Sequence, residues 1–150
     1  MMPAETKVWK IDPMRIEAHQ NDINRAAELL KQQEVVAFPT ETVYGLGADA
    51  TSEQAVRRIF EAKGRPSDNP LIVHVAQPEQ VHQLVTEIPE MAKKLMEAFM
   101  PGPLTLVMES SGAAAQNVTA GLSTVAVRIP DHPVALSLLE ACEVPLAAPS

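Results

Sequence analysis

Short apolar segments alternate with helix-like segments along the chain, and this alternation constrains the fold more than any other feature of the sequence. The segments with the length and composition of buried strands are 34–39, 71–75, 104–108, 124–130 and 144–150. Helical spacing is clearest in 22–31, where one face carries Ile23, Ala26, Ala27 and Leu30. Apolar strands that alternate with helices predict an α/β fold, in which helices flank a twisted, mixed and partly parallel sheet.

Residues that favour helix ends locate the first two helices. Asp22 is the expected cap of the first helix, because its side-chain oxygen can accept from the free backbone N–H groups of the first turn. Thr51 or Ser52 is the expected cap of the second helix. Gly64 is expected to end that second helix, since glycine adopts the left-handed conformation found after many helices.

Prolines suited to first turns mark later helices, which are expected after Pro78 and after Pro89, with another over 133–140. The helix after Pro89 has an expected buried face of Met91, Leu95, Ala98 and Phe99. The residues 40–50 are expected to form a loop.

Composition and charge narrow the possible functions. The 150 residues fit one domain, with a net charge of −7 and 3% aromatic residues. The negative charge argues against a protein that binds nucleic acid through phosphate contacts, and the few aromatic residues argue against one that stacks bases on aromatic rings. Cys142 is the only cysteine, and the absence of CxxC and HExxH patterns argues against a metal site. No run of about twenty apolar residues and no signal peptide is present, so a cytoplasmic location without membrane contact is expected.

A polar segment follows the first expected strand and offers hydroxyl groups beside it. Thr40 and Thr42 are alternate residues, so both hydroxyls face one side of an extended chain, and Tyr44, Gly45 and Gly47 follow. The two threonines can bind a ligand or satisfy the backbone of a turn, and the glycines can serve positive φ angles. Glu41 is either a general base or a solvated side chain.

A second polar segment places two cations, Lys63 and Arg65, on either side of Gly64. Such a pair suits a triphosphate or a pyrophosphate leaving group, although the segment lacks the P-loop pattern. Ser67 and Asn69 add polar groups beyond it.

Two further candidates lie within expected strands. A histidine inside a strand is more often a core residue, but a period of two puts His74 on the face opposite Val73, where it can point toward a site. Arg128 is costly to bury unpaired, so either a protein carboxylate or a ligand carboxylate is expected beside it. Thr124 shares the strand face of Arg128.

These segments resemble the YrdC/YciO family. The matching stretches are 39–47, 63–66 together with 69–75, 101–105, 124–130 and 145–150, and they occur in the order found in the family. The resemblance is to the branch that makes threonylcarbamoyl-AMP, a nucleotidyltransferase activity. It implies a YrdC-like fold, with L-threonine, bicarbonate and ATP as substrates, pyrophosphate as a product and Mg²⁺ on the phosphates. The adenylate then passes to a transferase complex that forms threonylcarbamoyladenosine on tRNA.

The resemblance also implies roles for individual residues. Threonine would be held by Thr42, His74, Arg128 and the backbone of Ala148. ATP would be held by Arg65, Asn69, Thr124 and Ser150. The groups that assist catalysis at the phosphates would be Lys63 and Arg65. No residue is assigned to a metal.

The sequence departs from the family pattern in one respect, and two alternative functions remain open. The family pattern continues beyond Ser150 with residues that complete the nucleotide pocket, so residues 1–150 are expected to be a YrdC-like domain truncated at its C-terminal end. Little or no synthase activity is therefore expected from this chain alone. One alternative is a YciO-like paralogue that acts on another carbamoyl-type adenylate. The other is a module of the same fold that binds double-stranded RNA weakly.

Overall fold

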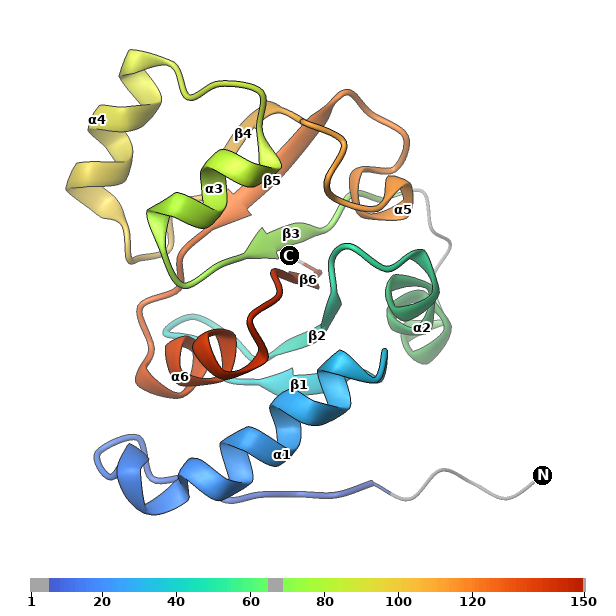
Figure 1. Cartoon of the computed structure of the whole chain (residues 1–150), viewed down its shortest axis with the longest axis vertical. Helices are drawn as coiled ribbons and strands as arrows, with labels where there is room; N and C mark the ends of the chain where they lie inside the picture. The colour runs from blue at the N-terminus through green and yellow to red at the C-terminus, as the bar shows by residue number, and fades with distance from the viewer. Residues whose placement is uncertain (1–5, 65–68, 150) are drawn as a thin grey trace.

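The computed structural model describes residues 6–64 and 69–149, which form a mixed sheet covered by helices (Figure 1). The strands are β1 Val36–Phe38, β2 Gly45–Asp49, β3 Ile72–His74, β4 Leu106–Glu109, β5 Thr124–Arg128 and β6 Leu146–Ala148. The helices are the 3₁₀ turn Ile16–His19, α1 Gln20–Lys31, α2 Glu53–Lys63, α3 Pro78–Leu84, α4 Glu90–Phe99, α5 Gln116–Thr119 and α6 Pro133–Cys142. The predicted α/β class is confirmed.

The sheet has the strand order β1-β2-β6-β3-β5-β4. Strands β3 and β5 are parallel and place His74 opposite Arg128, whereas β6 is antiparallel to both of its neighbours, β2 and β3. The last strand along the chain therefore lies in the middle of the sheet, and the C-terminus emerges beside β3 (Figure 1). This register brings the C-terminal ends of β3 and β5 side by side, although His74 and Arg128 are distant in the sequence.

Two apolar cores lie on opposite faces of the sheet. The larger one packs α2, α3 and α5 against residues such as Val73 and Val127, which are fully buried. The smaller one packs α1 and α6 against Phe38 and Leu146. Because residues alternate between faces along a strand, His74 and Arg128 lie on the face of the smaller core. Helices α1 and α6 cover that face at the β1, β2 and β6 side of the sheet.

The expected loop over 40–50 is partly wrong, because residues 45–49 form strand β2. Gly45 and Gly47 concealed the strand, since glycine is normally depleted in strands. Neither glycine has a positive φ angle; instead they make room for the ring of Phe38. A Cβ atom at Gly47 would lie 2.6 Å from Cε1 of Phe38, which no side chain tolerates without a shift.

The predicted caps of the first two helices had different outcomes. Ser52 caps α2 by accepting a hydrogen bond from the backbone N–H of Ala55, and Gly64 ends that helix with φ 64°. Asp22 does not cap α1, because the helix begins two residues earlier at Gln20, directly after a 3₁₀ turn. The cap of α1 is His19, which makes no side-chain capping hydrogen bond.

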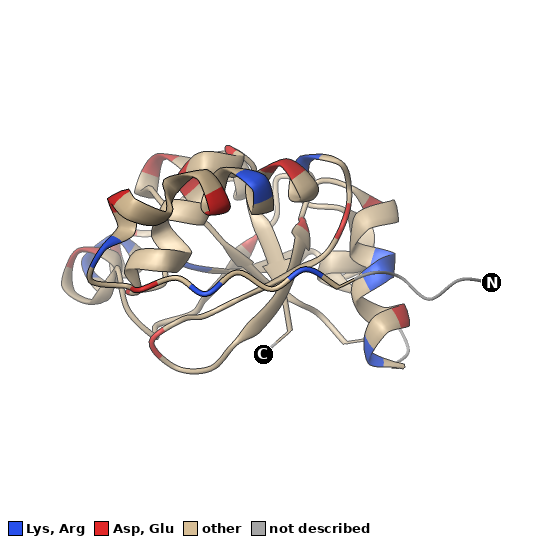
Figure 2. Cartoon of the chain, turned by 90° about the horizontal axis from the view of Figure 1, so that it is seen from below, with Lys and Arg blue, Asp and Glu red and all other residues tan. Residues whose placement is uncertain are grey.

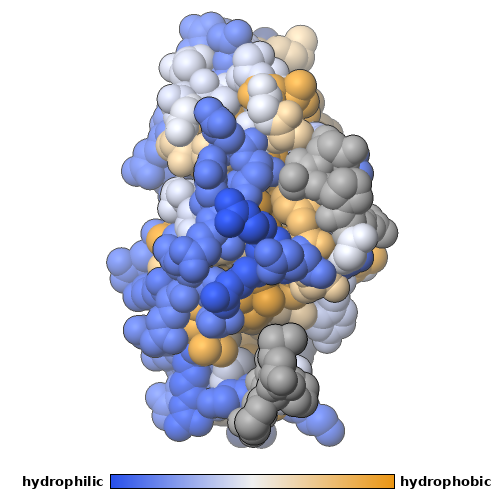
Figure 3. Space-filling model, turned by 90° about the vertical axis from the view of Figure 1, so that its right-hand side faces the viewer, coloured by the Kyte–Doolittle hydropathy of each residue, from blue (hydrophilic) through white to orange (hydrophobic). Residues whose placement is uncertain are grey.

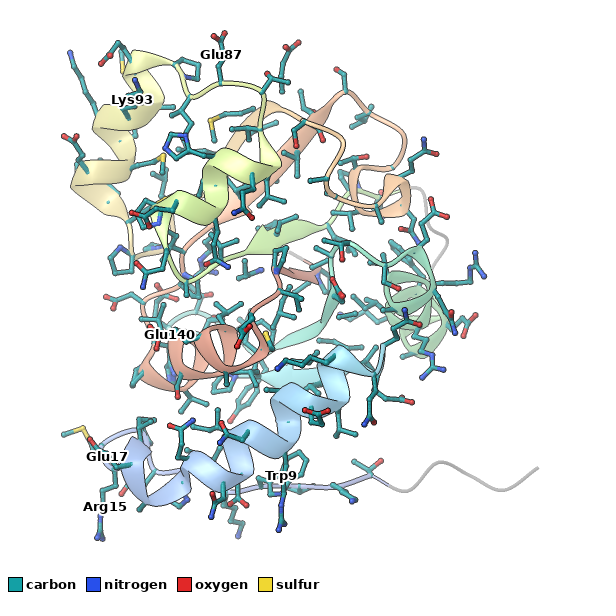
Figure 4. All side chains as sticks on the ribbon, viewed as in Figure 1. Trp9, Arg15, Glu17, Glu87, Lys93 and Glu140 are labelled. Atoms are coloured by element: carbon teal, nitrogen blue, oxygen red, sulfur yellow. The ribbon has the colours of Figure 1, made fainter. Side chains whose placement is uncertain are left out.

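The expected buried face of α4 is also wrong. Met91 is 69% exposed and Phe99 is 56% exposed, whereas the buried residues are Ala92 and Met96. The helix lies at the margin of the molecule, and Lys93 projects from it into solvent (Figure 4). The apolar residues of this helix form one broad side, and spacing alone could not decide which edge of that side packs.

The remaining surface is largely polar. Basic residues recur along α2, and acidic residues are spread over several other helices (Figure 2). The side of the molecule that carries α2 is mainly hydrophilic, with a band of apolar surface beside it (Figure 3). Within residues 6–64 and 69–149, no helix is long and apolar enough to cross a membrane.

Candidate functional site

Buried polar side chains mark the first part of the candidate site. In the described part of the chain, the polar or charged residues that are buried are His74, Thr119 and Arg128. His74 and Arg128 lie opposite each other at the C-terminal ends of the parallel strands β3 and β5. The turn between β1 and β2 adds Glu41 and Thr42 to them. We call Glu41, Thr42, His74 and Arg128 the Arg128 cluster.

Arg128 is held by three different groups of the protein. Its Nε donates to the carbonyl oxygen of Gly102 at 3.0 Å, and its Nη1 donates to Oγ1 of Thr42 at 3.3 Å. Its Nη2 donates to Oε1 of Glu41 and forms an ion pair with that carboxylate. A guanidinium group has five N–H donors, so each terminal nitrogen keeps one N–H without a partner among the described residues. Arg128 can therefore still bind a planar oxygen ligand such as a carboxylate.

The protein carboxylate beside Arg128 is Glu41, so one of the two expected partners of the arginine is present. The other oxygen of Glu41 accepts a hydrogen bond from the backbone N–H of Asp131 at 2.8 Å. Glu41 thus connects the β1–β2 turn to the residues that follow β5. The sequence alone left Glu41 as either a general base or a solvated side chain, because its partners lie about ninety residues away.

Gly102 is a further member of the site that sequence reasoning missed. It is buried, and a Cβ atom at this position would lie 2.5 Å from the carbonyl oxygen of Phe99. Only glycine fits without a backbone shift, and its own carbonyl oxygen then fixes Nε of Arg128. The Pro-Gly-Pro stretch around Gly102 was the available signal.

His74 is an uncharged member of the cluster. Burial, together with the positive charge of Arg128, lowers the pKa of His74 from 6.5 to about 4. Its Nδ1 lies 3.1 Å from the carbonyl oxygen of Ile72, which can only accept, so Nδ1 carries the proton. The ring also meets the edge of Phe38 at a centroid distance of 5.8 Å. At neutral pH, Nε2 is therefore a hydrogen-bond acceptor in a fixed position.

The sequence left open whether Thr40 and Thr42 bind a ligand or satisfy the backbone of the β1–β2 turn, and the structure shows different contacts for each of them. Their hydroxyl groups lie 3.0 Å apart, so they share one side as expected. Thr40 satisfies the turn, since its Oγ1 donates to the carbonyl oxygen of Val43 at 2.7 Å. Thr42 reaches Arg128 instead. Tyr44 is 76% exposed.

The second part of the candidate site lies at the opposite ends of β3 and β5. Thr124 begins β5 and is half-buried, and the exposed Asn69 precedes β3. Lys63, also exposed, ends α2. Ala148 is buried in β6 opposite Ile72, which pairs with Ala126, so Ala148 lies level with the middle of β5, between Thr124 and Arg128. Four residue steps along a strand separate Thr124 from Arg128, a span of roughly 13 Å.

Three of the predicted site residues, Arg65, Ser67 and Ser150, lie outside the described residues. The others form two groups rather than one. Thr42, His74 and Arg128 are brought together, whereas Asn69 and Thr124 lie at the N-terminal ends of β3 and β5. Lys63 ends α2, which packs in the larger core on the other face of the sheet.

Among the described residues, no helix packs over the sheet face between the two groups. Ile72, Thr124 and Ala126 are only half-buried on this face, and Val107 on the neighbouring edge strand β4 is 64% exposed. An elongated ligand could therefore lie along β3 and β5 and reach both groups at once.

Two hollows elsewhere on the surface do not contain these residues. One has a volume of about 340 Å³ and is lined by Glu53, Arg57 and Asn117 among others. The other, of about 280 Å³, lies where Trp9 packs along α1 (Figure 4). Neither hollow contains buried charged groups, so the Arg128 cluster remains the better candidate.

Comparisons with known proteins point to one family. The family model Sua5_yciO_yrdC, described as "Telomere recombination", matches residues 28–150. A threonylcarbamoyl-AMP synthase of Bacillus subtilis is 55% identical over 149 residues, which cover 97% of this chain and 43% of that protein. A threonylcarbamoyl-AMP synthase of Pyrococcus abyssi is 58% identical over 128 residues, which cover 85% of this chain and 38% of that protein.

A solved structure gives the same result. The structure of Pyrococcus abyssi Sua5 complexed with L-threonine matches with a TM-score of 0.85 and 56% identity, over 87% of this chain and 38% of that one. The chain therefore spans about two fifths of the length of these relatives.

Proposed function

Because the chain belongs to the Sua5_yciO_yrdC family, we propose that it forms the substrate-binding part of a threonylcarbamoyl-AMP synthase. The observation that carries the proposal is the state of Arg128. This buried arginine keeps two N–H donors without partners among the described residues, next to an uncharged histidine and a hydroxyl group. Such a combination suits a small molecule that has a carboxylate and further polar groups.

L-threonine occupies the Arg128 cluster in this proposal. Its carboxylate accepts from the two available N–H donors of Arg128, and its hydroxyl group donates to Nε2 of His74. Thr42 offers a hydroxyl group on the same side, and the backbone of Ala148 borders the molecule toward the other group. The P. abyssi relative was solved with L-threonine, which supports this class of ligand.

ATP occupies the other end of the uncovered sheet face. Lys63 and Arg65 are assigned to the triphosphate, and Asn69, Thr124 and Ser150 to the rest of the nucleotide. The length of β5 supports this arrangement, because Thr124 and Arg128 lie at its two ends, roughly 13 Å apart.

The proposed reaction needs no covalent bond to the enzyme. The ammonium group of threonine loses a proton to solvent, and the resulting amine combines with bicarbonate to give a carbamate and water. A carbamate oxygen then attacks the α-phosphorus of ATP, so that pyrophosphate leaves and threonylcarbamoyl-AMP remains. The residues contribute by positioning and by stabilising charge on the departing pyrophosphate, a role that suits Lys63 and Arg65.

The described residues do not form a resident metal centre. They contain no group of three or more His, Cys, Asp and Glu side chains that could hold a metal ion. Mg²⁺ is proposed to arrive with ATP and to be held by phosphate oxygens and water, as is usual for this ion. No step above depends on it.

The product is proposed to serve a transferase complex that modifies tRNA. The formal charge of −7 suits the handling of small molecules better than tight binding of RNA by this chain.

Replacement of Arg128 tests the proposal in the natural protein that carries this sequence. We expect Arg128→Ala to weaken L-threonine binding by about 2–5 kcal/mol, because a charged partner is lost. ATP binding should change far less, since the nucleotide lies at the other end of the strands. Calorimetry with each ligand measures both affinities, and threonine-dependent pyrophosphate release measures turnover.

Two further variants make the outcome interpretable. Arg128→Lys keeps the charge but loses the planar fork, so it should retain the fold and still weaken threonine binding. Arg25→Ala removes an exposed arginine from α1 and is the matched control. Unchanged threonine affinity in a folded Arg128 variant would contradict the assignment, and pyrophosphate release that does not require threonine would favour a paralogous activity.

A further inference from the structure

We propose that Glu41 binds the ammonium group of the amino-acid substrate and selects zwitterions over simple carboxylates. This inference rests on the proposed function, because it assumes that a substrate carboxylate binds Arg128. It extends that function to a residue with no role in it so far. The ammonium and carboxylate groups of an α-amino acid are attached to the same carbon atom. A carboxylate bound to Arg128 therefore brings the ammonium group close to the neighbours of Arg128, and Glu41 is the acidic one among them.

Glu41 has the free hydrogen-bonding capacity that this role requires. An ionised carboxylate can accept about four hydrogen bonds. The described residues supply two, one from Nη2 of Arg128 and one from the backbone N–H of Asp131. The Glu41 side chain is 24% exposed, whereas that of Arg128 is 9% exposed. Glu41 can thus accept from a ligand without releasing Arg128.

The charges of the cluster favour a zwitterion. Arg128 and Glu41 neutralise each other, and the low pKa of His74 keeps its ring uncharged at neutral pH. A simple carboxylate would add one uncompensated negative charge beside Glu41 and near the exposed Asp131. A zwitterion adds no net charge, and its ammonium group faces the carboxylate of Glu41. Partial burial of the cluster increases the difference in binding between a zwitterion and a simple carboxylate, because charges interact more strongly where water is partly excluded.

Two other roles for Glu41 are physically reasonable and make different predictions. If Glu41 only holds Arg128 in position, its loss weakens every carboxylate ligand equally. If Glu41 only competes with the substrate for Arg128, its loss strengthens every carboxylate ligand equally. Recognition of the ammonium group alone changes the preference between a ligand that has this group and one that lacks it.

The experiment compares L-threonine with 3-hydroxybutyrate, which has the same carbon skeleton and lacks the amino group. Calorimetry gives both dissociation constants for the natural protein, for Glu41→Gln and for Glu41→Asp. Glu90→Gln removes an exposed carboxylate that lies 3.6 Å from Lys93 and is the matched control. Thermal melting confirms that each variant is folded.

We expect the unchanged protein and the control to prefer L-threonine strongly. Glu41→Gln should reduce this preference at least tenfold, chiefly through weaker threonine binding. Glu41→Asp retains the negative charge, so it should restore part of the preference, and it replaces Glu41→Gln as the decisive variant if that protein does not fold. An equal change for both ligands in the decisive variant overturns the role of Glu41 and leaves the proposed function intact. Failure of the unchanged protein to bind L-threonine overturns the proposed function itself.

Discussion

Replacement of His74 by asparagine should change how the stability of the protein depends on pH. The asparagine amide can donate to the carbonyl oxygen of Ile72, as Nδ1 of His74 does at 3.1 Å, but it does not titrate. His74 is 4% exposed, and burial together with the positive charge of Arg128 lowers its pKa to about 4. The unfolded chain has the ordinary value of 6.5.

The sign of the effect follows from the protons that each state binds. Between pH 6.5 and pH 4 the unfolded chain binds a proton at His74 that the folded protein excludes. The free energy of unfolding therefore falls as the pH is lowered through this range. From pH 7 to pH 5 the loss due to His74 is about 2 kcal/mol, and it approaches about 3 kcal/mol near pH 4. His74→Asn should remove this part of the pH dependence.

Urea unfolding at pH 7, 6 and 5 measures the effect before most carboxylates begin to titrate. The difference in stability between His74→Asn and the unchanged protein should shift by about 2 kcal/mol in favour of the variant from pH 7 to pH 5. His82→Asn, which replaces an exposed histidine on α3, is the matched control. Parallel pH profiles for His74→Asn and the unchanged protein would refute the reasoning, because His74 would then titrate alike in the folded and unfolded states.

Two predictions concern packing and helix capping. Gly47→Ala should destabilise the protein by about 1–3 kcal/mol, because its Cβ would lie 2.6 Å from the ring of Phe38. Gly45→Ala is the control, because its Cβ meets nothing closer than 3.4 Å, and this variant should lose much less stability. Thermal melts of the two variants decide this, and equal losses would contradict it. Ser52→Ala should cost about 1 kcal/mol, since the N–H of Ala55 loses its partner; a change near zero in urea unfolding would show that the cap is replaced by water.

Much of the fold could be predicted because local patterns dominate it. The buried face of α1 follows from apolar spacing, and Gly64 ends α2 as its conformational freedom suggests. The strands β3 and β5 are apolar runs whose alternation places His74 and Arg128 on one face. Each of these features depends on residues within one element, so the sequence contains the information directly.

The predictions from sequence were wrong or incomplete where the structure depends on contacts between elements that are distant in the sequence. Gly45 and Gly47 look unfavourable in a strand until Phe38 is placed above them. The packed part of α4 depends on which edge of its one apolar side joins the larger core. The ion pair between Glu41 and Arg128 joins residues 87 positions apart, so no local pattern could distinguish it from a ligand contact. The sequence predicted that Arg128 needs a carboxylate but could not tell where it comes from.

The arrangement of charge along β3 and β5 is consistent with the proposal that one sheet face binds two unlike substrates. At the C-terminal ends of these strands, Arg128 is balanced by Glu41 and His74 is uncharged, so the cluster suits a molecule with no net charge. The positive charge that the proposal assigns to the polyanion comes from Lys63, in the last turn of α2. If the two ends exchanged character, a zwitterion would meet an excess of cations and a triphosphate would meet Glu41. Under this proposal, an amino acid and a nucleotide bind at opposite ends of β5, where Arg128 and Thr124 lie four residues apart.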